Sequence, residues 1–196
     1  MGELALNLHQ RRARLGLKGP RAADWLAAQG MVLPAAPNTW TQAADAAAGG
    51  ELLVARLGSS EFFLEDGAEG TTLKRMAPIL GTTPGVYPVL REDWAFHLGG
   101  ERVHDVLAQV CNVNFAALSL DSHPVIMTLM IGVAVLVVPQ DEASGAGEAG
   151  GGAGEGGGAG ERQYRIWCDP TFGPYLGESL GAVVSECGGR YTGVSL

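Results

Sequence analysis

The sequence contains few cysteines and no long apolar run, and each shortage excludes a class of protein. Its 196 residues include three cysteines, Cys111, Cys168 and Cys187, without C-x-x-C spacing. This pattern argues against a disulfide framework or a zinc knuckle and favours reduced thiols in the cytoplasm. The first residues lack the apolar segment of a secretion signal. The apolar run 125–138 covers 14 residues, whereas a membrane-spanning helix needs about 20, so we expect a cytoplasmic protein without membrane contact.

Charge is also scarce, because charged residues make up 17% of the chain and the formal net charge is −8. Five acidic residues and no basic residue lie within residues 141–161, so the rest of the chain carries a net charge of −3. A chain of this charge lacks the basic surface that binds the phosphates of nucleic acid. Its neutral surface is of the kind that becomes buried against another protein.

Glycine, by contrast, is abundant in one place. Between Ser144 and Gly160, ten of seventeen residues are glycine and four are alanine. Such a segment loses too much entropy on ordering to form a packed element, so residues 141–162 are predicted to be a flexible insert. The β-rich runs 133–138 and 164–168 flank it. We therefore predict a hairpin whose turn has been lengthened, because loop closure costs little more as a loop grows.

An internal repeat relates the two halves of the chain. Residues 15–27 and 96–108 align at a constant offset of 81, with six identical pairs: Leu17/Leu98, Gly19/Gly100, Arg21/Arg102, Asp24/Asp105, Leu26/Leu107 and Ala27/Ala108. Each segment predicts a strand, a glycine turn and a helix. Each is followed by an irregular stretch, a hairpin and a second helix, expected near 71–80 and 172–184.

The fold predicted from this repeat is α+β, with two tandem ferredoxin-like plaits of the order β-α-β-β-α. Each plait has an antiparallel sheet with helices on one face. We expect an N-terminal basic tail over residues 1–13, a first plait over 14–85 and a second plait over 86–196.

Several short motifs occur in an order that resembles a known family. These are residues 15–20 (LGLKGP), 23–26 (ADWL) and 37–40 (PNTW) in the first half, and 125–135 and 167–176 in the second. Over residues 15–189 they resemble the gamma subunit of heterotetrameric sarcosine oxidase. That family's fold is related to the folate-binding domain of the glycine-cleavage T-protein, which is itself built from duplicated plaits.

The resemblance implies a non-catalytic accessory subunit of a sarcosine-oxidase-type flavoenzyme complex, which demethylates sarcosine or another N-methyl amine in one-carbon metabolism. Flavin, NAD and tetrahydrofolate are then expected on the large partner subunits, with no cofactor on this chain. The sequence agrees, because no G-x-G-x-x-G joins a strand to a helix and no G-x-x-x-x-G-K-[ST] is present.

Two alternatives to this function remain open. The first is a free-standing folate-binding aminomethyltransferase-like enzyme. Its T-protein relatives place an acidic residue just after the first helix, where residues 30–34 contain none. The second is a scaffold or ligand-sensing module that kept the fold and lost the oxidase.

Individual motifs predict no catalytic or metal site. His97 and His104 are seven residues apart, on a predicted strand and a predicted helix, which is not ligand spacing. The segment 58–60 (GSS) is predicted to be a hairpin turn. Residues 169–171 are predicted to start a helix, with Asp169 or Thr171 as its cap.

The candidate partner interface is Asn38, Thr39 and Trp40. A tryptophan in a proline-rich loop must bury its large ring, either against a partner or as the anchor of its own loop.

Overall fold

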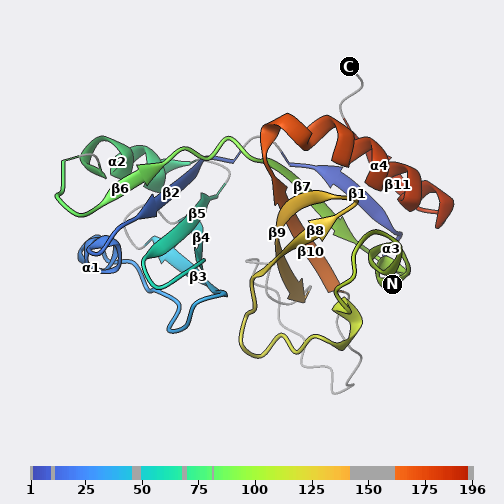
Figure 1. The fold of residues 1–196 in the computed structure, drawn as a ribbon, viewed down its shortest axis with the longest axis horizontal. Helices are drawn as coiled ribbons and strands as arrows, with labels where there is room; N and C mark the ends of the chain where they lie inside the picture. The colour runs from blue at the N-terminus through green and yellow to red at the C-terminus, as the bar shows by residue number, and fades with distance from the viewer. Residues whose placement is uncertain are drawn as a thin grey trace. The chain divides into compact units, whose positions relative to one another are not determined.

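The computed structural model describes residues 2–9, 12–45, 50–67, 70–80, 82–141 and 162–193, and its fold is α+β as predicted. The chain forms two compact units. The first unit contains residues 9–93 and 121–126, and the second contains the N-terminal residues up to Leu8 together with residues 94–120 and those from Met127 onward. Figure 1 shows the elements of both.

The first unit follows the order β-α-β-β-β-α-β. Its elements are β2 (Arg14–Lys18), α1 (Ala22–Ala28), β3 (Thr39–Asp45), β4 (Gly50–Arg56), β5 (Glu61–Asp66), α2 (Thr71–Leu80) and β6 (Tyr87–Val89). The strands form one antiparallel sheet in the order β3-β4-β5-β2-β6. Both helices pack on one face of this sheet, because Trp25 and Leu26 of α1 and Met76 of α2 share a buried cluster with Leu17, Val54 and Phe62 of the strands.

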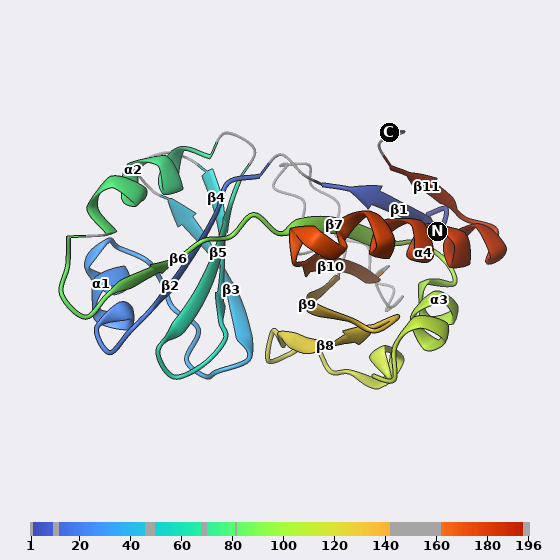
Figure 2. The same ribbon diagram turned by 45° about the horizontal axis from the view of Figure 1, so that its top comes forward.

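The second unit repeats this order and adds one strand. Its elements are β1 (Ala5–Leu8), β7 (Trp94–Gly99), α3 (Val103–Val110), the 3-10 turn η1 (Phe115–Ala117), β8 (Ile126–Met130), β9 (Val133–Asp141), β10 (Arg162–Cys168), the 3-10 turn η3 (Pro170–Phe172), α4 (Gly173–Glu186) and β11 (Arg190–Thr192). The sheet order is β8-β9-β10-β7-β1-β11. Figure 2 shows α4 running along the strands β7, β1 and β11.

The structure corrects the predicted plaits in the number of strands. Each half has three strands between its helices instead of two, and one more strand after the second helix. The irregular stretch predicted after α1 contains β3. The single apolar run 125–138 contains the whole of one strand, β8, and the start of the next, β9. The predicted helix over 71–80 is confirmed as α2.

The predicted domain boundaries also differ from the two units. The predicted basic tail 1–13 contains β1, which pairs antiparallel with β7 and parallel with β11 in the second unit. The chain passes between the units at 93/94 rather than 85/86, because β6 still pairs with β2 of the first unit.

The predicted lengthened hairpin is confirmed in its strands. β9 and β10 pair antiparallel from Val135 opposite Cys168 to Asp141 opposite Arg162. The predicted flexible insert lies outside the described residues between these last two positions.

The repeat found in the sequence corresponds to equivalent backbone positions. Gly19 and Gly100 each follow the first strand of their half and have positive φ values of 129° and 103°. A Cβ on Gly19 would meet the carbonyl oxygen of Gly85, and one on Gly100 would meet that of Glu3. Both glycines are therefore required where another backbone segment approaches closely.

Candidate functional site

The predicted interface residues lie at the start of β3, where a distant part of the chain pairs with them. The amide of Asn38 donates to the carbonyl of Arg56 (2.7 Å) on β4, and the amide of Val125 donates to the carbonyl of Asn38 (2.8 Å). The amide of Trp40 donates to the carbonyl of His123 (2.8 Å). Segment 121–126 therefore binds along the outer side of β3 within the first unit.

The backbone at this contact has two left-handed residues. Asn38 has φ 58° and His123 has φ 48°, a region in which asparagine and histidine are several-fold enriched among residues other than glycine. Asn38 is exposed, Thr39 is half-buried, and the Thr39 hydroxyl donates to the carbonyl of Ala36 (2.6 Å). These residues fix the loop in front of β3.

Trp40 is buried, with 4% of its surface exposed. Its ring makes an edge contact with the His123 ring at 5.1 Å between centroids. The indole N–H is buried and has no hydrogen-bond partner among the described residues. This position fits the loop-anchor alternative for Trp40. A partner interface at Asn38 and Thr39 stays a prediction.

A second cluster of polar side chains lies in the second unit, between α3 and β10. The His104 Nε2 and the Tyr164 hydroxyl are 2.7 Å apart, and Tyr164 is 1% exposed. Arg162 donates through Nη1 to the carbonyl of Phe115 (3.0 Å), whose ring packs edge-on against Tyr164.

The environment of this cluster favours neutral forms of both titratable groups. Burial, with the nearby positive charge of Arg162, lowers the pKa of His104 below 6.5, although the carboxylate of Asp105 acts in the opposite direction. Burial also raises the pKa of Tyr164 above 10.0. The cluster therefore presents a neutral imidazole hydrogen-bonded to a neutral phenol, which satisfies the buried hydroxyl.

The histidines considered as metal ligands lie on different elements. His97 is on β7, whereas His104 on α3 is bound to Tyr164. In the described ranges, no three His, Cys, Asp or Glu side chains gather as a metal-binding group. The side chains of Cys111, Cys168 and Cys187 are buried, and none of them forms a disulfide.

Two turns have the roles predicted for them. Residues 58–60 connect β4 to β5, and Arg56 holds this turn by donating to the carbonyls of Gly58 (3.2 Å) and Ser59 (3.1 Å). Asp169 precedes η3 and accepts from the amide of Thr171 (2.8 Å). Hydrogen bonding by the Thr171 side chain, and then by its amide, lowers the pKa of the Asp169 carboxyl. Both are local structural features.

One buried ion pair is missing from the sequence prediction. Arg14 Nε lies 2.7 Å from Glu65 Oε2, and both side chains are at most 3% exposed. Arg14 also donates to the carbonyls of Asp93 (2.6 Å) and His9 (3.0 Å). His9 and Asp93 are the first and last residues of the longer of the two stretches that make up the first unit. Arg14 therefore joins the two ends of the stretch 9–93 within the first unit.

The described helices include none that is long and apolar enough to cross a bilayer. The large apolar side chains that are at least half exposed in the second unit are Met127, Leu129, Phe172 and Tyr175. Met127 and Leu129 alternate on β8, at the edge of the sheet. The Tyr175 hydroxyl donates to the carbonyl of Ile131 (3.5 Å), in the turn after β8.

Comparison with known proteins identifies the fold. No family model and no curated protein matches the sequence. Among solved structures, a chain of heterotetrameric sarcosine oxidase from Corynebacterium sp. U-96, in complex with pyrrole 2-carboxylate, matches with a TM-score of 0.64 at 22% identity. The match covers 100% of this chain and 90% of that chain.

Glycine cleavage system aminomethyltransferase T from Bartonella henselae matches with a TM-score of 0.60 at 16% identity. That match covers 91% of this chain and 45% of that chain, so the chain spans less than half the length of the aminomethyltransferase. Likeness at these identities shows the fold. The fold implied by the resemblance in the sequence is therefore confirmed.

Proposed function

We propose that this chain is a gamma-like accessory subunit of a sarcosine-oxidase-type flavoenzyme complex that acts on sarcosine or a related N-methyl amine in one-carbon metabolism. The observation that carries the proposal is the match along the whole chain to 90% of a chain from a heterotetrameric sarcosine oxidase. The motifs quoted above, which resemble the gamma subunit of such an oxidase, support the same role.

The proposed division of labour leaves the redox chemistry to the larger subunits. Flavin, NAD and tetrahydrofolate bind there, and this chain supplies no catalytic residue. Its sequence supports this division, because it lacks the glycine-rich loops that hold dinucleotides and nucleoside phosphates. Three reduced cysteines are consistent with a complex in the cytoplasm.

The exposed apolar side chains support the proposal that the chain binds other subunits. Met127, Leu129, Phe172 and Tyr175 are each 51–59% exposed, and a surface of low charge that carries large apolar groups is typical of protein contact sites. Asn38 and Thr39 remain candidates for a second contact.

The experiment that tests the proposal uses the purified chain alone. We expect it to be colourless and to oxidise no N-methyl amine, because the flavin belongs to a partner. A stoichiometric flavin absorbance, or turnover of sarcosine by the chain alone, would overturn the accessory role.

The aminomethyltransferase-like alternative has support from the fold match to aminomethyltransferase T. It requires an acidic group for the aminomethyl substrate, and residues 30–34 offer none. Tetrahydrofolate-dependent aminomethyl transfer by the isolated chain would favour this alternative over the accessory role.

A further inference from the structure

A cavity lies on one face of the six-stranded sheet in the second unit. Its volume is about 240 Å³, and β1, β7 and β10 line it. The side chains of Asn7, His97 and Gln163 belong to its lining. Their strand neighbours Leu6 and Tyr164, which point to the opposite face because side chains alternate along a strand, are at most 1% exposed.

The hollow exists because two of the smallest residues are neighbours in the sheet. Ala5 on β1 is paired with Gly99 on β7, and Gly99 is also paired with Gln163 on β10. A glycine inside a strand often marks a place where a ligand or another backbone approaches closely. A Cβ at Gly99 would come within 3.1 Å of Gln163 Cγ, so the Gln163 side chain leans over the glycine.

The N-terminal residues form one wall of the cavity and are held in place by the backbone. The amide of Glu101 donates to the carbonyl of Gly2 (3.0 Å), and Gly100, at φ 103°, allows Glu3 to approach. The Glu3 carboxylate lies 2.8 Å from the guanidinium of Arg190. The Glu3 carboxylate at this wall is therefore already paired with a positive charge, that of Arg190.

Two of the four polar side chains in the lining are primary amides, those of Asn7 and Gln163. The Asn7 carbonyl oxygen accepts from the Thr192 hydroxyl, which leaves the amide nitrogen to donate elsewhere. The Gln163 amide and the His97 imidazole complete the set.

We propose that this cavity binds a small uncharged ring that presents a hydrogen-bond donor next to an acceptor, such as a cyclic amide or imide. Primary amide side chains pair with such an edge through one donor and one acceptor. Glu3, the one carboxylate among the lining residues, is paired with Arg190 at the surface, so the lining favours a ligand that needs no counter-ion. The volume is below that of sites for drug-sized ligands, about 300–1,000 Å³, so a single ring fits.

The test uses uracil as the probe and the complete ¹⁵N-labelled chain in solution. We expect saturable NMR shifts of the Gly99 and Gly100 amides and of the Gln163 side-chain amide, with a Kd of about 1 mM or below. Orotate, the same ring with a carboxylate, should bind at least tenfold more weakly. The substitution Gln163→Leu removes an amide from the lining, and Ala5→Leu fills the hollow.

Both variants should weaken uracil binding at least tenfold, whereas Gln42→Leu on β3 of the first unit should leave it unchanged. If Gln163→Leu does not fold, Ala5→Leu carries the test. The proposal fails if uracil produces no saturable shifts, if binding survives both cavity variants, or if orotate binds as tightly as uracil.

Discussion

At the scale of single residues, Trp40 stabilises the place where two distant parts of the sequence meet. Its amide and its ring both contact His123, while its neighbour Asn38 is bonded to Val125 and to Arg56. Asn38 and His123 both have left-handed φ values where the two segments pair. Removal of the indole ring should therefore lower the stability of the first unit.

We expect Trp40→Ala to lower the free energy of unfolding by about 3–5 kcal/mol, the cost of removing a large buried aromatic side chain. Chemical denaturation of the chain measures this loss. Val32→Ala is the matched control, because Val32 is 67% exposed, and it should change stability by about 0.5 kcal/mol or less. Unchanged stability of Trp40→Ala would contradict the anchor role, and weakened partner binding in its place would support the interface.

His104 makes stability depend on pH in a defined direction. Its pKa is lowered in the folded chain, so the unfolded chain takes up a proton first as the pH falls through 6.5. The wild type should therefore lose stability from about pH 7 downward, and His104→Gln should lose less over the same range. Urea denaturation at several pH values checks this. Identical pH profiles for the two proteins would show that His104 is not responsible.

At the scale of elements, the helices could be predicted because their signals are local. Gly30, at φ 81°, follows the end of α1 in the left-handed conformation that glycine adopts readily. The amide of Met31 donates to the carbonyl of Leu26, which closes the helix end. The apolar residues of α3 recur at helical spacing, and Val103, Val106, Leu107 and Val110 are buried.

The strands that the sequence did not predict depend on distant pairing. β1 is four residues long and lies between β7 and β11, which are remote in the sequence. β3 contains Ala43 and Ala44, and alanine is depleted in strands. β8 and β9 are joined by Ile131 and Gly132, both at positive φ, and isoleucine is a rare residue in such a turn because it is β-branched.

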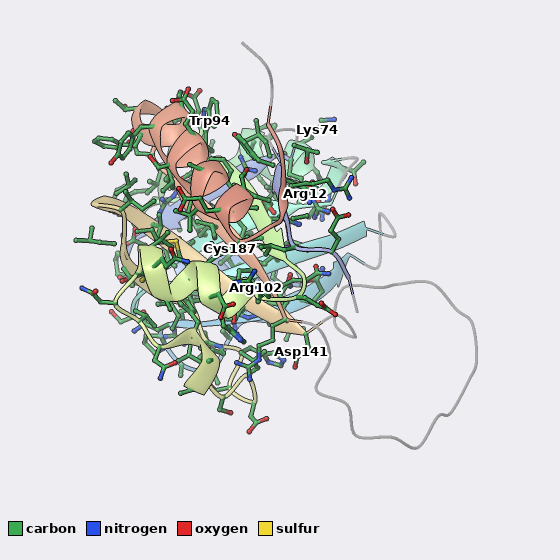
Figure 3. The ribbon with its side chains drawn as sticks, turned by 90° about the vertical axis from the view of Figure 1, so that its right-hand side faces the viewer. Arg12, Lys74, Trp94, Arg102, Asp141 and Cys187 are labelled. Atoms are coloured by element: carbon green, nitrogen blue, oxygen red, sulfur yellow. The ribbon has the colours of Figure 1, made fainter. Side chains whose placement is uncertain are left out.

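The glycine-rich insert supplies a prediction about the β9–β10 hairpin. Asp141, labelled in Figure 3, and Arg162 are paired residues at the ends of these strands. Replacing residues 142–161 with Asn-Gly gives a two-residue turn suited to that pairing. We expect the melting temperature to change by about 2 °C or less, because a long polar loop adds little to stability. Differential scanning calorimetry measures it, and a fall of more than about 5 °C would mean that the insert contributes packing.

At the scale of the whole molecule, the two units share one order of elements, but a different strand pairs with the first repeat strand in each. β6 pairs antiparallel with β2 in the first unit, and β1 pairs antiparallel with β7 at the equivalent place in the second. β11, the repeat counterpart of β6, consequently lies one strand further out and pairs with β1 instead of β7. A repeat of six identical residues was sufficient to predict the duplication, whereas the strand substitution depends on pairing across nearly the whole chain.

The candidate site could be predicted only in part for the same reason. Trp40 is recognisable as a ring that must be buried, but its partner His123 is 83 positions away. Arg14 and Glu65 are 51 residues apart and resemble ordinary surface charges in the sequence, although both are buried. The pairing of His104 with Tyr164 depends equally on the packing of α3 against the sheet.

The central claim is that this chain works as one subunit of a flavoenzyme complex. Its most direct test is affinity purification of the tagged full chain from its native cells, followed by flavin absorbance, subunit masses and sarcosine oxidation of the isolated material. The account predicts a stoichiometric complex with larger chains that carries flavin and oxidises sarcosine or another N-methyl amine. A chain that purifies alone, or with partners that contain no flavin, would contradict it.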